Sequence, residues 1–178
     1  MRPLPPLSLP LILSVLFSFP VTGEVEDFDP FAAAEQSGSS SKMEFLSEAR
    51  SIASGQPFHL VIKLTHPPHW HSYFINPGFV GLSLQPNWKL PPEFKVERVA
   101  WPVPHIGSTA GKKTYGYEPL VYHLFKVIPP SNLTVGDKIT IGASPEWMIC
   151  DENNCLPEPG IGQPDLSAEI AFPVAAEA

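Results

Sequence analysis

Residues 58–65 read Phe-His-Leu-Val-Ile-Lys-Leu-Thr, and this segment decides the fold class. Every second residue, beginning with Phe58, is a large hydrophobic one, and residues such as His59 and Lys63 lie between them. A period of two places the hydrophobic side chains on one face of a β-strand. We therefore predict a strand over residues 58–65 with that face toward a core.

Seven further segments have the length and composition of short strands. They are His71–Ile75, Leu82–Trp88, Phe94–Trp101, Leu120–Ile128, Lys138–Ala143, Glu146–Cys150 and Ala168–Val174. Turn sequences rich in proline, glycine and asparagine separate them at intervals of roughly ten residues, and no segment has a helical period. Short strands at this spacing predict an all-β fold, an antiparallel β-sandwich.

The composition excludes several classes of protein. Proline accounts for 23 of the 178 residues, against a usual share of roughly 5 per cent, and it interrupts helices because its nitrogen carries no hydrogen-bond donor. A helical bundle is therefore excluded, whereas prolines at strand ends and edges suit a sandwich. The net charge is −7 and the basic residues form no cluster, so neither nucleic acid nor anionic lipid is an expected partner.

The first 23 residues have the pattern of a secretory signal peptide. Arg2 is followed by a mainly apolar run over residues 9–17, and the small residues Val21 and Gly23 precede acidic residues. The run is shorter than the roughly 20 residues that span a bilayer, which disfavours an uncleaved anchor. We predict a soluble periplasmic or secreted protein that is not embedded in a membrane after cleavage.

The rest of the chain divides into a lead-in and one domain. Residues 24–42 are acidic and then rich in alanine and serine, without an apolar period, which predicts a flexible lead-in. Residues 43–178 are predicted to form the β-sandwich, because their number suits a single domain. No internal repeat at the period of a solenoid or a propeller is present in the sequence.

Cys150 and Cys155 are the only cysteines of the sequence, and four residues separate them across a polar turn. Outside the cytoplasm such a pair is expected to form a disulfide. A ring this small stabilises a fold by about 2 kcal/mol in the chain-entropy model, so stapling alone is a weak reason for the bond. Acidic neighbours without nearby Lys or Arg disfavour the thiolate, which predicts slow thiols that exchange when a dedicated partner docks. An inert structural disulfide stays an alternative, whereas two thiolates alone do not complete a zinc site.

Several segments of the chain, taken in order, resemble one known family. They are Trp70–Gly78, Trp88–Pro91, Trp101–Pro104, Tyr115–Glu118, Trp147–Cys150 and Cys155–Glu158. Together they make residues 69–159 similar to the amino-terminal periplasmic domain of the thiol:disulfide interchange protein DsbD and its ScsB-like relatives. The resemblance implies an immunoglobulin-like sandwich whose Cys-x4-Cys pair accepts electrons from a membrane-delivered source and passes them to periplasmic disulfides.

The resemblance also implies roles for individual residues. Cys155 resembles the cysteine that forms the mixed disulfide with partners, and Cys150 the one that closes the ring, so these two would be the catalytic residues. Tyr115, Gly116 and Tyr117 resemble the family's cap loop, which covers the disulfide until a partner arrives. Aromatic rings would exclude adventitious thiols there, and glycine would let the loop lift. The alternative is that both tyrosines pack at the start of a strand.

The implied protein is an oxidoreductase-type electron carrier without a cofactor. Its implied donor is a membrane electron-carrier protein or a thioredoxin-like protein, and its implied clients are periplasmic proteins that carry disulfides. The resemblance covers neither the membrane-embedded carrier nor the carboxy-terminal thioredoxin-like domain of the full protein. We therefore expect the electrons to come from a separate protein.

Three histidines allow a second interpretation. His66, His69 and His71 occur in the segment His-Pro-Pro-His-Trp-His. If the chain is extended after Pro68, His69 and His71 project from one face, where imidazoles suit copper or zinc. The alternative function is therefore a metal-binding periplasmic sandwich with a purely structural disulfide. No arrangement of residues supports a hydrolase or a transferase.

Overall fold

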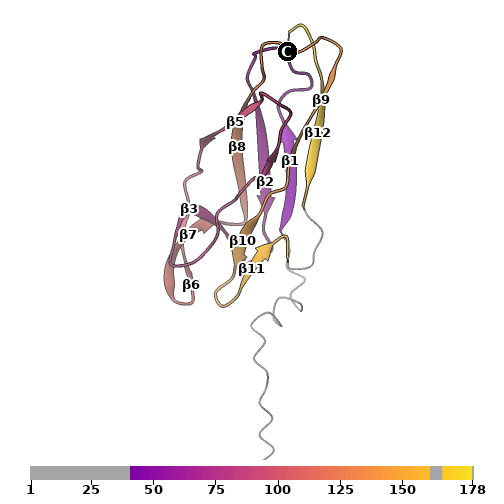
Figure 1. The fold of residues 1–178 in the computed structure, drawn as a ribbon. Coiled ribbons are helices and arrows are strands. Elements are labelled where there is room, and N and C mark those ends of the chain that lie inside the picture. Colours follow the sequence, from indigo (N-terminus) through magenta and orange to yellow (C-terminus); the bar gives the residue numbers. More distant parts are fainter. Residues whose placement is uncertain (1–40, 161–165, 178) are drawn as a thin grey trace, which may run out of the picture. The chain divides into compact units, whose positions relative to one another are not determined.

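The computed structural model of the protein describes residues 41–160 and 166–177. All regular secondary structure within those ranges is β-strand (Figure 1). The strands are β1 (Lys42–Ser47), β2 (Phe58–Thr65), β3 (Ser72–Gly78), β4 (Trp88–Lys89), β5 (Lys95–Ala100), β6 (His105–Thr109), β7 (Lys112–Tyr117), β8 (Leu120–Ile128), β9 (Lys138–Ala143), β10 (Trp147–Cys150), β11 (Cys155–Glu158) and β12 (Ala168–Pro173). Among these described residues, no helix is long and apolar enough to cross a bilayer.

One layer is a four-stranded antiparallel sheet with the order β1-β2-β8-β5. Strand β2 spans the predicted residues 58–65, and its residues alternate between buried and partly exposed along its whole length. Its register with β8 pairs Phe58 with Val127 and Thr65 with Leu120. The period-two pattern therefore faces a core as predicted.

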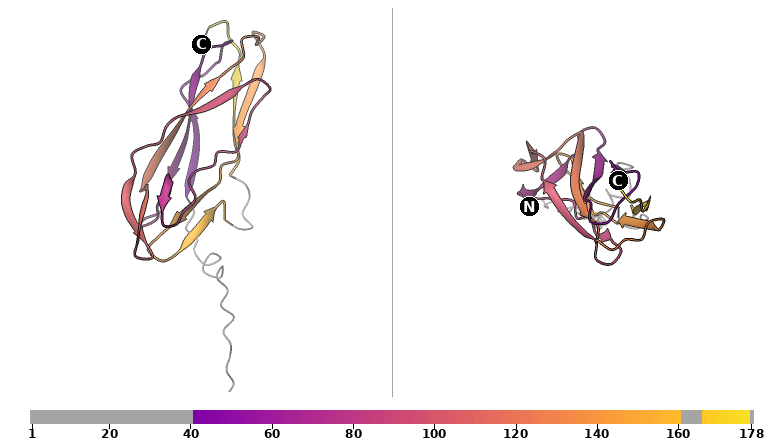
Figure 2. Two further views of the ribbon diagram at one scale, coloured as in Figure 1. Left: turned by 60° about the vertical axis from the view of Figure 1, so that its left-hand side comes forward. Right: turned by 90° about the horizontal axis from the view of Figure 1, so that it is seen from above.

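The remaining strands form the three-stranded sheets β12-β9-β4 and β3-β7-β6 and the hairpin β10-β11. Isolated bridges connect these pieces, and one of them pairs His71, directly before β3, with Cys150 at the end of β10. Strands β9 and β12 run roughly along the direction of β1 and β2 in both drawings of the domain (Figures 1 and 2). This is the arrangement of an aligned β-sandwich.

The hydrophobic core lies between the layers in two clusters. One cluster contains Ile62 of β2 together with Trp147 and Ile149 of β10. The other contains Leu60 of β2 and Phe172 of β12. The predicted all-β fold, an immunoglobulin-like antiparallel sandwich, is confirmed, and burial of Ile149 fixes the position of the cysteine that follows it.

Some predicted boundaries differ from the observed ones. The predicted strand over residues 82–88 contributes only Trp88 to β4, while Ser83 and Gln85 form isolated bridges. Pro86 interrupts this segment because it has no N–H to donate to a ladder. Strand β1 begins at Lys42, the last residue of the expected lead-in. The rest of that lead-in, apart from Ser41, and the predicted signal peptide lie outside the described residues.

Four strands were not predicted at all, namely β1, β6, β7 and β11. In β6 the first four residues are exposed, and β7 begins with two exposed lysines, so neither strand alternates hydrophobic with polar residues. Strand β11 has only four residues, one of them Pro157. Strands β6, β7 and β11 are defined by pairing with their neighbours, although β7 and β11 also contribute buried residues such as Tyr117 and Leu156.

Candidate functional site

The two cysteines face each other across the β10–β11 hairpin. The register pairs Cys150 directly with Cys155, and their Cα atoms lie 4.1 Å apart. Directly opposite residues of antiparallel strands point to the same face of the sheet. The sulfur atoms are joined in a disulfide with an S–S distance of 2.00 Å. The pairing expected from composition and compartment is therefore present.

A carboxylate shapes the turn between the cysteines. Oδ1 of Asp151 accepts hydrogen bonds from the backbone N–H groups of Asn153 at 2.7 Å and of Asn154 at 2.6 Å. The backbone N–H of Asp151 in turn donates to the carbonyl of Asn154 at 3.0 Å. Burial acts to raise the pKa of Asp151, but these hydrogen bonds outweigh it and the pKa is lowered. Asp151 thus stays ionised and holds a tight Asx-type turn.

The two sulfur-bearing residues differ in exposure. Cys150 is 0% exposed, whereas Cys155 is partly exposed. On either side of the pair, Ile149 and Leu156 are buried in the core. The hairpin is therefore anchored by its hydrophobic face, and an attacking thiol reaches Cys155 more easily than Cys150.

His71 is the cross-strand neighbour of Cys150 on the other side. Its N–H donates to the carbonyl of Cys150, and the N–H of Cys150 donates to the carbonyl of His71, both at 3.0 Å. Its Nε2 and Oγ1 of Thr109 share a hydrogen bond at 3.3 Å, and the ring packs edge-on against Tyr73. Burial lowers the pKa of His71, although the carboxylates of Glu118 and Asp151 act to raise it.

The predicted cap residues Tyr115, Gly116 and Tyr117 lie in strand β7 and not in a loop. Tyr117 is 3% exposed, and its hydroxyl donates to the carbonyl of Pro102 at 2.8 Å. Burial raises the pKa of Tyr117 to about 12, although Arg98 acts to lower it. Tyr117 therefore packs within the domain at the last residue of β7, and the role of residues 115–117 as a cap stays a prediction.

Strands β6 and β7 form a hairpin. Its tip contacts the cysteine turn, which is formed by residues 151–154 between the two cysteines. The N–H of Ala110 donates to the carbonyl of Glu152 at 2.9 Å. Just before it, the hydroxyl of Thr109 lies within hydrogen-bond distance of both His71 Nε2 and the Tyr73 hydroxyl, at 3.3 and 3.2 Å. The β6–β7 and β10–β11 hairpins turn at the same end of the domain in Figure 1.

The three histidines of the predicted metal cluster differ in burial and in hydrogen-bond partners. His66 is buried, and its Nδ1 lies 2.7 Å from the hydroxyl of Ser41. Burial, aided by His71, lowers the pKa of His66 to about 4. His69 is exposed with a left-handed backbone at φ 70°, and His71 is turned toward Thr109. Within residues 41–160 and 166–177, no three His, Cys, Asp or Glu side chains are grouped so that they could hold a metal ion.

The sequence did not reveal a partner for His123, and the structure supplies one. Arg98 lies 3.2 Å from Nδ1 of His123, and its guanidinium also stacks on Trp101. Because arginine can only donate, Nδ1 of His123 accepts and the ring is neutral. Burial, aided by Arg98, lowers the pKa of His123 to about 3. Only the pairing of β5 with β8 brings these residues together.

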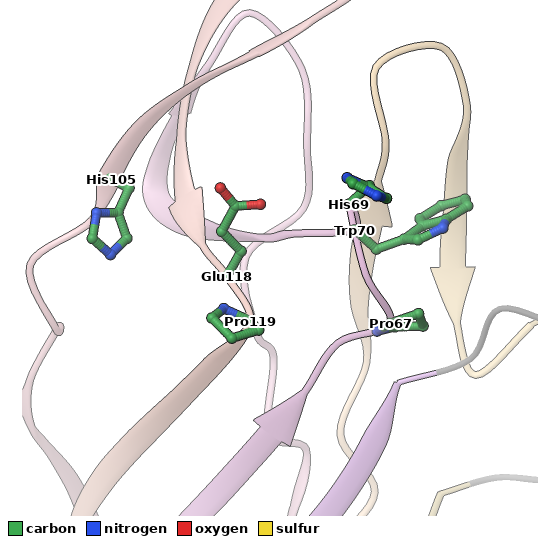
Figure 3. Close-up of a pocket in the computed structure, with 6 residues that line it drawn as sticks. All are labelled: Pro67, His69, Trp70, His105, Glu118 and Pro119. Atoms are coloured by element: carbon green, nitrogen blue, oxygen red, sulfur yellow. The ribbon is translucent and has the colours of Figure 1, made fainter.

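Two adjoining cavities lie beside the histidines. The first has a volume of about 340 Å³, and Figure 3 draws its lining residues, with Glu118 between His105 on one side and His69 on the other. The second has a volume of about 290 Å³ and shares those three residues. It extends to Asp151 and Glu152, so it reaches the turn between the two cysteines.

Comparisons with known proteins were made for the whole chain. Residues 42–160 match the family described as "Thiol:disulfide interchange protein DsbD, N-terminal". This match begins further toward the amino terminus than the resemblance of residues 69–159, and it includes β1 and β2. No curated protein matches the chain.

The solved structures that are similar to this one include two periplasmic or DsbD N-terminal domains. The N-terminal periplasmic domain of ScsB from Proteus mirabilis has 15% sequence identity and a TM-score of 0.48, and the alignment covers 75% of this chain and 46% of that chain. The n-terminal domain of Neisseria meningitidis DsbD in the reduced form has 10% identity and a TM-score of 0.30, with 74% and 83% of the two chains covered. The chain thus spans less than half the length of the ScsB chain.

Proposed function

Because the chain belongs to the family of DsbD N-terminal domains, we propose that it carries electrons between proteins by opening and closing the Cys150–Cys155 disulfide. The family is one of thiol:disulfide interchange domains, and the disulfide is formed in this chain. The proposed place of action is the periplasm or another space outside the cytoplasm. The proposed donor is a membrane electron carrier or a thioredoxin-like protein, and the proposed clients are proteins with disulfides.

One observation carries the proposal, namely the unequal exposure of the two cysteines. Thiol–disulfide exchange requires that a thiolate approach one sulfur along the S–S axis, so access selects which sulfur is attacked. Cys155 is partly exposed and Cys150 is fully buried. This supports the assignment of Cys155 as the residue that bonds to partners and of Cys150 as the residue that closes the ring.

The proposed reaction moves two electrons in two exchanges. A donor thiolate attacks Sγ of Cys155, the Cys150–Cys155 bond breaks, and Cys150 leaves as a thiolate that takes up a proton. A second donor thiol then attacks the mixed disulfide, so that the donor leaves oxidised and Cys155 leaves reduced. Toward a client the steps run in the opposite sense: Cys155 attacks the client disulfide, and Cys150 releases the reduced client.

The β6–β7 hairpin is proposed to cover the pair, in place of a separate cap loop at residues 115–117. Its tip touches the cysteine turn through the Ala110–Glu152 hydrogen bond, and Thr109 ties it to His71 beside Cys150. Strand β7 is paired with β3, so only the tip of the hairpin, which these few hydrogen bonds hold, is proposed to lift. Its position would limit attack to partners that displace or accommodate it.

The test is to trap partners on single-cysteine chains expressed with the proposed signal peptide. In a Cys150→Ser chain the resolving thiol is absent, so mixed disulfides on Cys155 should accumulate and be visible as higher bands on non-reducing gels. A Cys155→Ser chain is the matched control, and we expect at least tenfold fewer adducts because Cys150 is buried. Mass spectrometry of the bands would identify the partners.

Two results would contradict the proposal. Equal trapping by both single-cysteine chains would contradict the roles of the two cysteines. A redox titration in which the native bond stays closed far below about −300 mV would favour an inert structural disulfide, because such potentials are typical of structural bonds.

A further inference from the structure

The second cavity reaches the turn between Cys150 and Cys155 through Asp151 and Glu152. It has a volume of about 290 Å³ and is lined by residues of three separate elements: the cysteine turn, the β6–β7 hairpin and the segment around His71. Asp151, which follows Cys150 in the chain, and Glu152 form the side nearest the disulfide. The cavity therefore reaches the turn that joins the two cysteines, although neither cysteine lines it.

Carboxylates are the only charged side chains in the cavity lining when its three histidines, His69, His71 and His105, are neutral. Three carboxylates line it, those of Glu118, Asp151 and Glu152, and its lining contains neither Lys nor Arg. Glu118 and Glu152 are exposed, while the hydrogen bonds of the turn lower the pKa of Asp151. None of the three forms a salt bridge with another residue in the described part of the chain. Carboxylates gathered in this way repel one another unless a cation joins them.

The floor of the cavity contains a buried hydroxyl without a partner. Thr114 is 0% exposed and lines the cavity, and its Oγ1 has no hydrogen-bond partner among the described residues. Buried polar groups are normally hydrogen-bonded, so an unpartnered one at a cavity points to a ligand that donates. Gly107 and Gly116 line the same cavity and carry no side chain that would fill it.

We propose that this cavity receives the side chain of a lysine or arginine that lies within a few residues of the reactive cysteine of a partner protein. The inference rests on the proposed function and adds the chemistry of the partner. An ammonium or guanidinium group carries only donors, which match the carboxylates and the Thr114 hydroxyl. An extended chain advances by about 3.3 Å per residue, so a cation one to three residues from the partner's cysteine reaches the cavity while that cysteine is bonded to Cys155.

The test uses peptides as probes and the equilibrium formation of a mixed disulfide as the readout. The full chain with Cys150→Ser is mixed with acetyl-Cys-Gly-Lys-amide, with acetyl-Cys-Gly-Gln-amide or with acetyl-Cys-Gly-Glu-amide, each supplied as its symmetric disulfide. The Cys155 thiolate attacks that disulfide, forms Cys155–S–S–peptide and releases one peptide thiol, so the reaction balances without another reductant. Mass spectrometry gives the equilibrium constant, and a Cys150→Ala chain serves as a second background.

We expect the lysine peptide to form the mixed disulfide three- to tenfold more favourably than the glutamine peptide, and the glutamate peptide to be disfavoured by a similar factor. Adding Glu118→Gln and Glu152→Gln should reduce the preference for lysine to less than twofold. The matched control carries Glu97→Gln and Glu169→Gln, which remove two exposed charges on β5 and β12. This control should keep the preference.

Three results would overturn the inference. These are equal constants for the three peptides, an equal loss of preference in the control chain, and a Cys155 that forms no mixed disulfide with any peptide. The Cys150→Ser chain cannot form the native disulfide. The peptide preference measured with it therefore does not depend on whether the native disulfide is redox-active. An inert native bond would show in the redox titration, whereas a cavity without preference for cations would show only here.

Discussion

Gly116 occupies a position where no side chain fits. The resemblance to the family implied that it is a flexible residue in a cap loop. In the structure it lies in β7, opposite Tyr73 of β3 and His105 of β6. A Cβ atom at this position would overlap the carbonyl oxygen of Ser72 and lie 3.3 Å from Cδ2 of His71. The residue is small because two backbones approach each other closely, next to the strand that pairs with Cys150.

We therefore expect Gly116→Ala to lower the free energy of unfolding by about 1–3 kcal/mol, the usual cost of forcing atoms into a filled site. Urea denaturation of the purified chain measures this. Gly107→Ala is the matched control, since its nearest contact would be Oγ1 of Thr114 at 3.4 Å, and it should change stability by less than about 1 kcal/mol. Equal losses in the two chains would show that the close approach to β3 is not the reason for Gly116.

The β10–β11 hairpin is the element that determines how easily the disulfide forms. Its register places the cysteines opposite each other, and the carboxylate of Asp151 closes the turn between them. A turn that is already formed keeps the two thiols close in the reduced state. The equilibrium between dithiol and disulfide therefore depends on the turn as well as on the sulfur atoms.

Asp151→Ala should make the disulfide easier to reduce. Loss of the two turn hydrogen bonds is worth about 1–2 kcal/mol, which corresponds to a roughly 5- to 30-fold shift of the equilibrium toward the dithiol. Equilibration with reduced and oxidised dithiothreitol, followed by thiol counting, measures the shift.

Asp151→Asn is the control for this prediction. Asparagine keeps the oxygen that accepts both backbone hydrogen bonds but removes the charge. We expect its equilibrium to stay within about threefold of the parent chain. If the asparagine chain shifts as far as the alanine chain, charge rather than turn geometry sets the equilibrium.

At the scale of the whole domain, the core and the disulfide are largely independent sources of stability. The two hydrophobic clusters join the sheet β1-β2-β8-β5 to strands of the facing layer, and the disulfide closes only a short hairpin at one end. The proposed exchange of electrons would need this separation, because the domain would have to stay folded in both redox states.

A chain with Cys150→Ser and Cys155→Ser should therefore still fold. The chain-entropy model assigns the small ring about 2 kcal/mol, and we expect the free energy of unfolding to fall by about that amount. Far-UV circular dichroism should match the parent chain, and urea unfolding should stay cooperative with an unchanged slope. Loss of the cooperative transition would mean that the disulfide holds the sandwich together.

The sequence predicts some strands of the domain and misses others. Strands β2, β8 and β9 were predicted with their observed bounds, because each has enough hydrophobic residues for a local pattern to be clear. The disulfide followed from having two cysteines close in sequence. Strands β6 and β7 were missed because their sequences show no regular alternation of hydrophobic and polar residues, and the contact of their hairpin with the cysteine turn was missed with them.

The sequence by itself determined the β class, the strands with strong alternation, the position of the cysteine pair and the resemblance to a family. These depend on residues near one another in the chain, where a period or a spacing has a direct structural meaning. Only the tertiary structure decided that Cys150 is buried and Cys155 accessible, that His71 pairs with Cys150, and that Glu118 joins Asp151 and Glu152 around one cavity. Such juxtapositions arise from the register between strands far apart in sequence, and no local pattern of residues specifies that register.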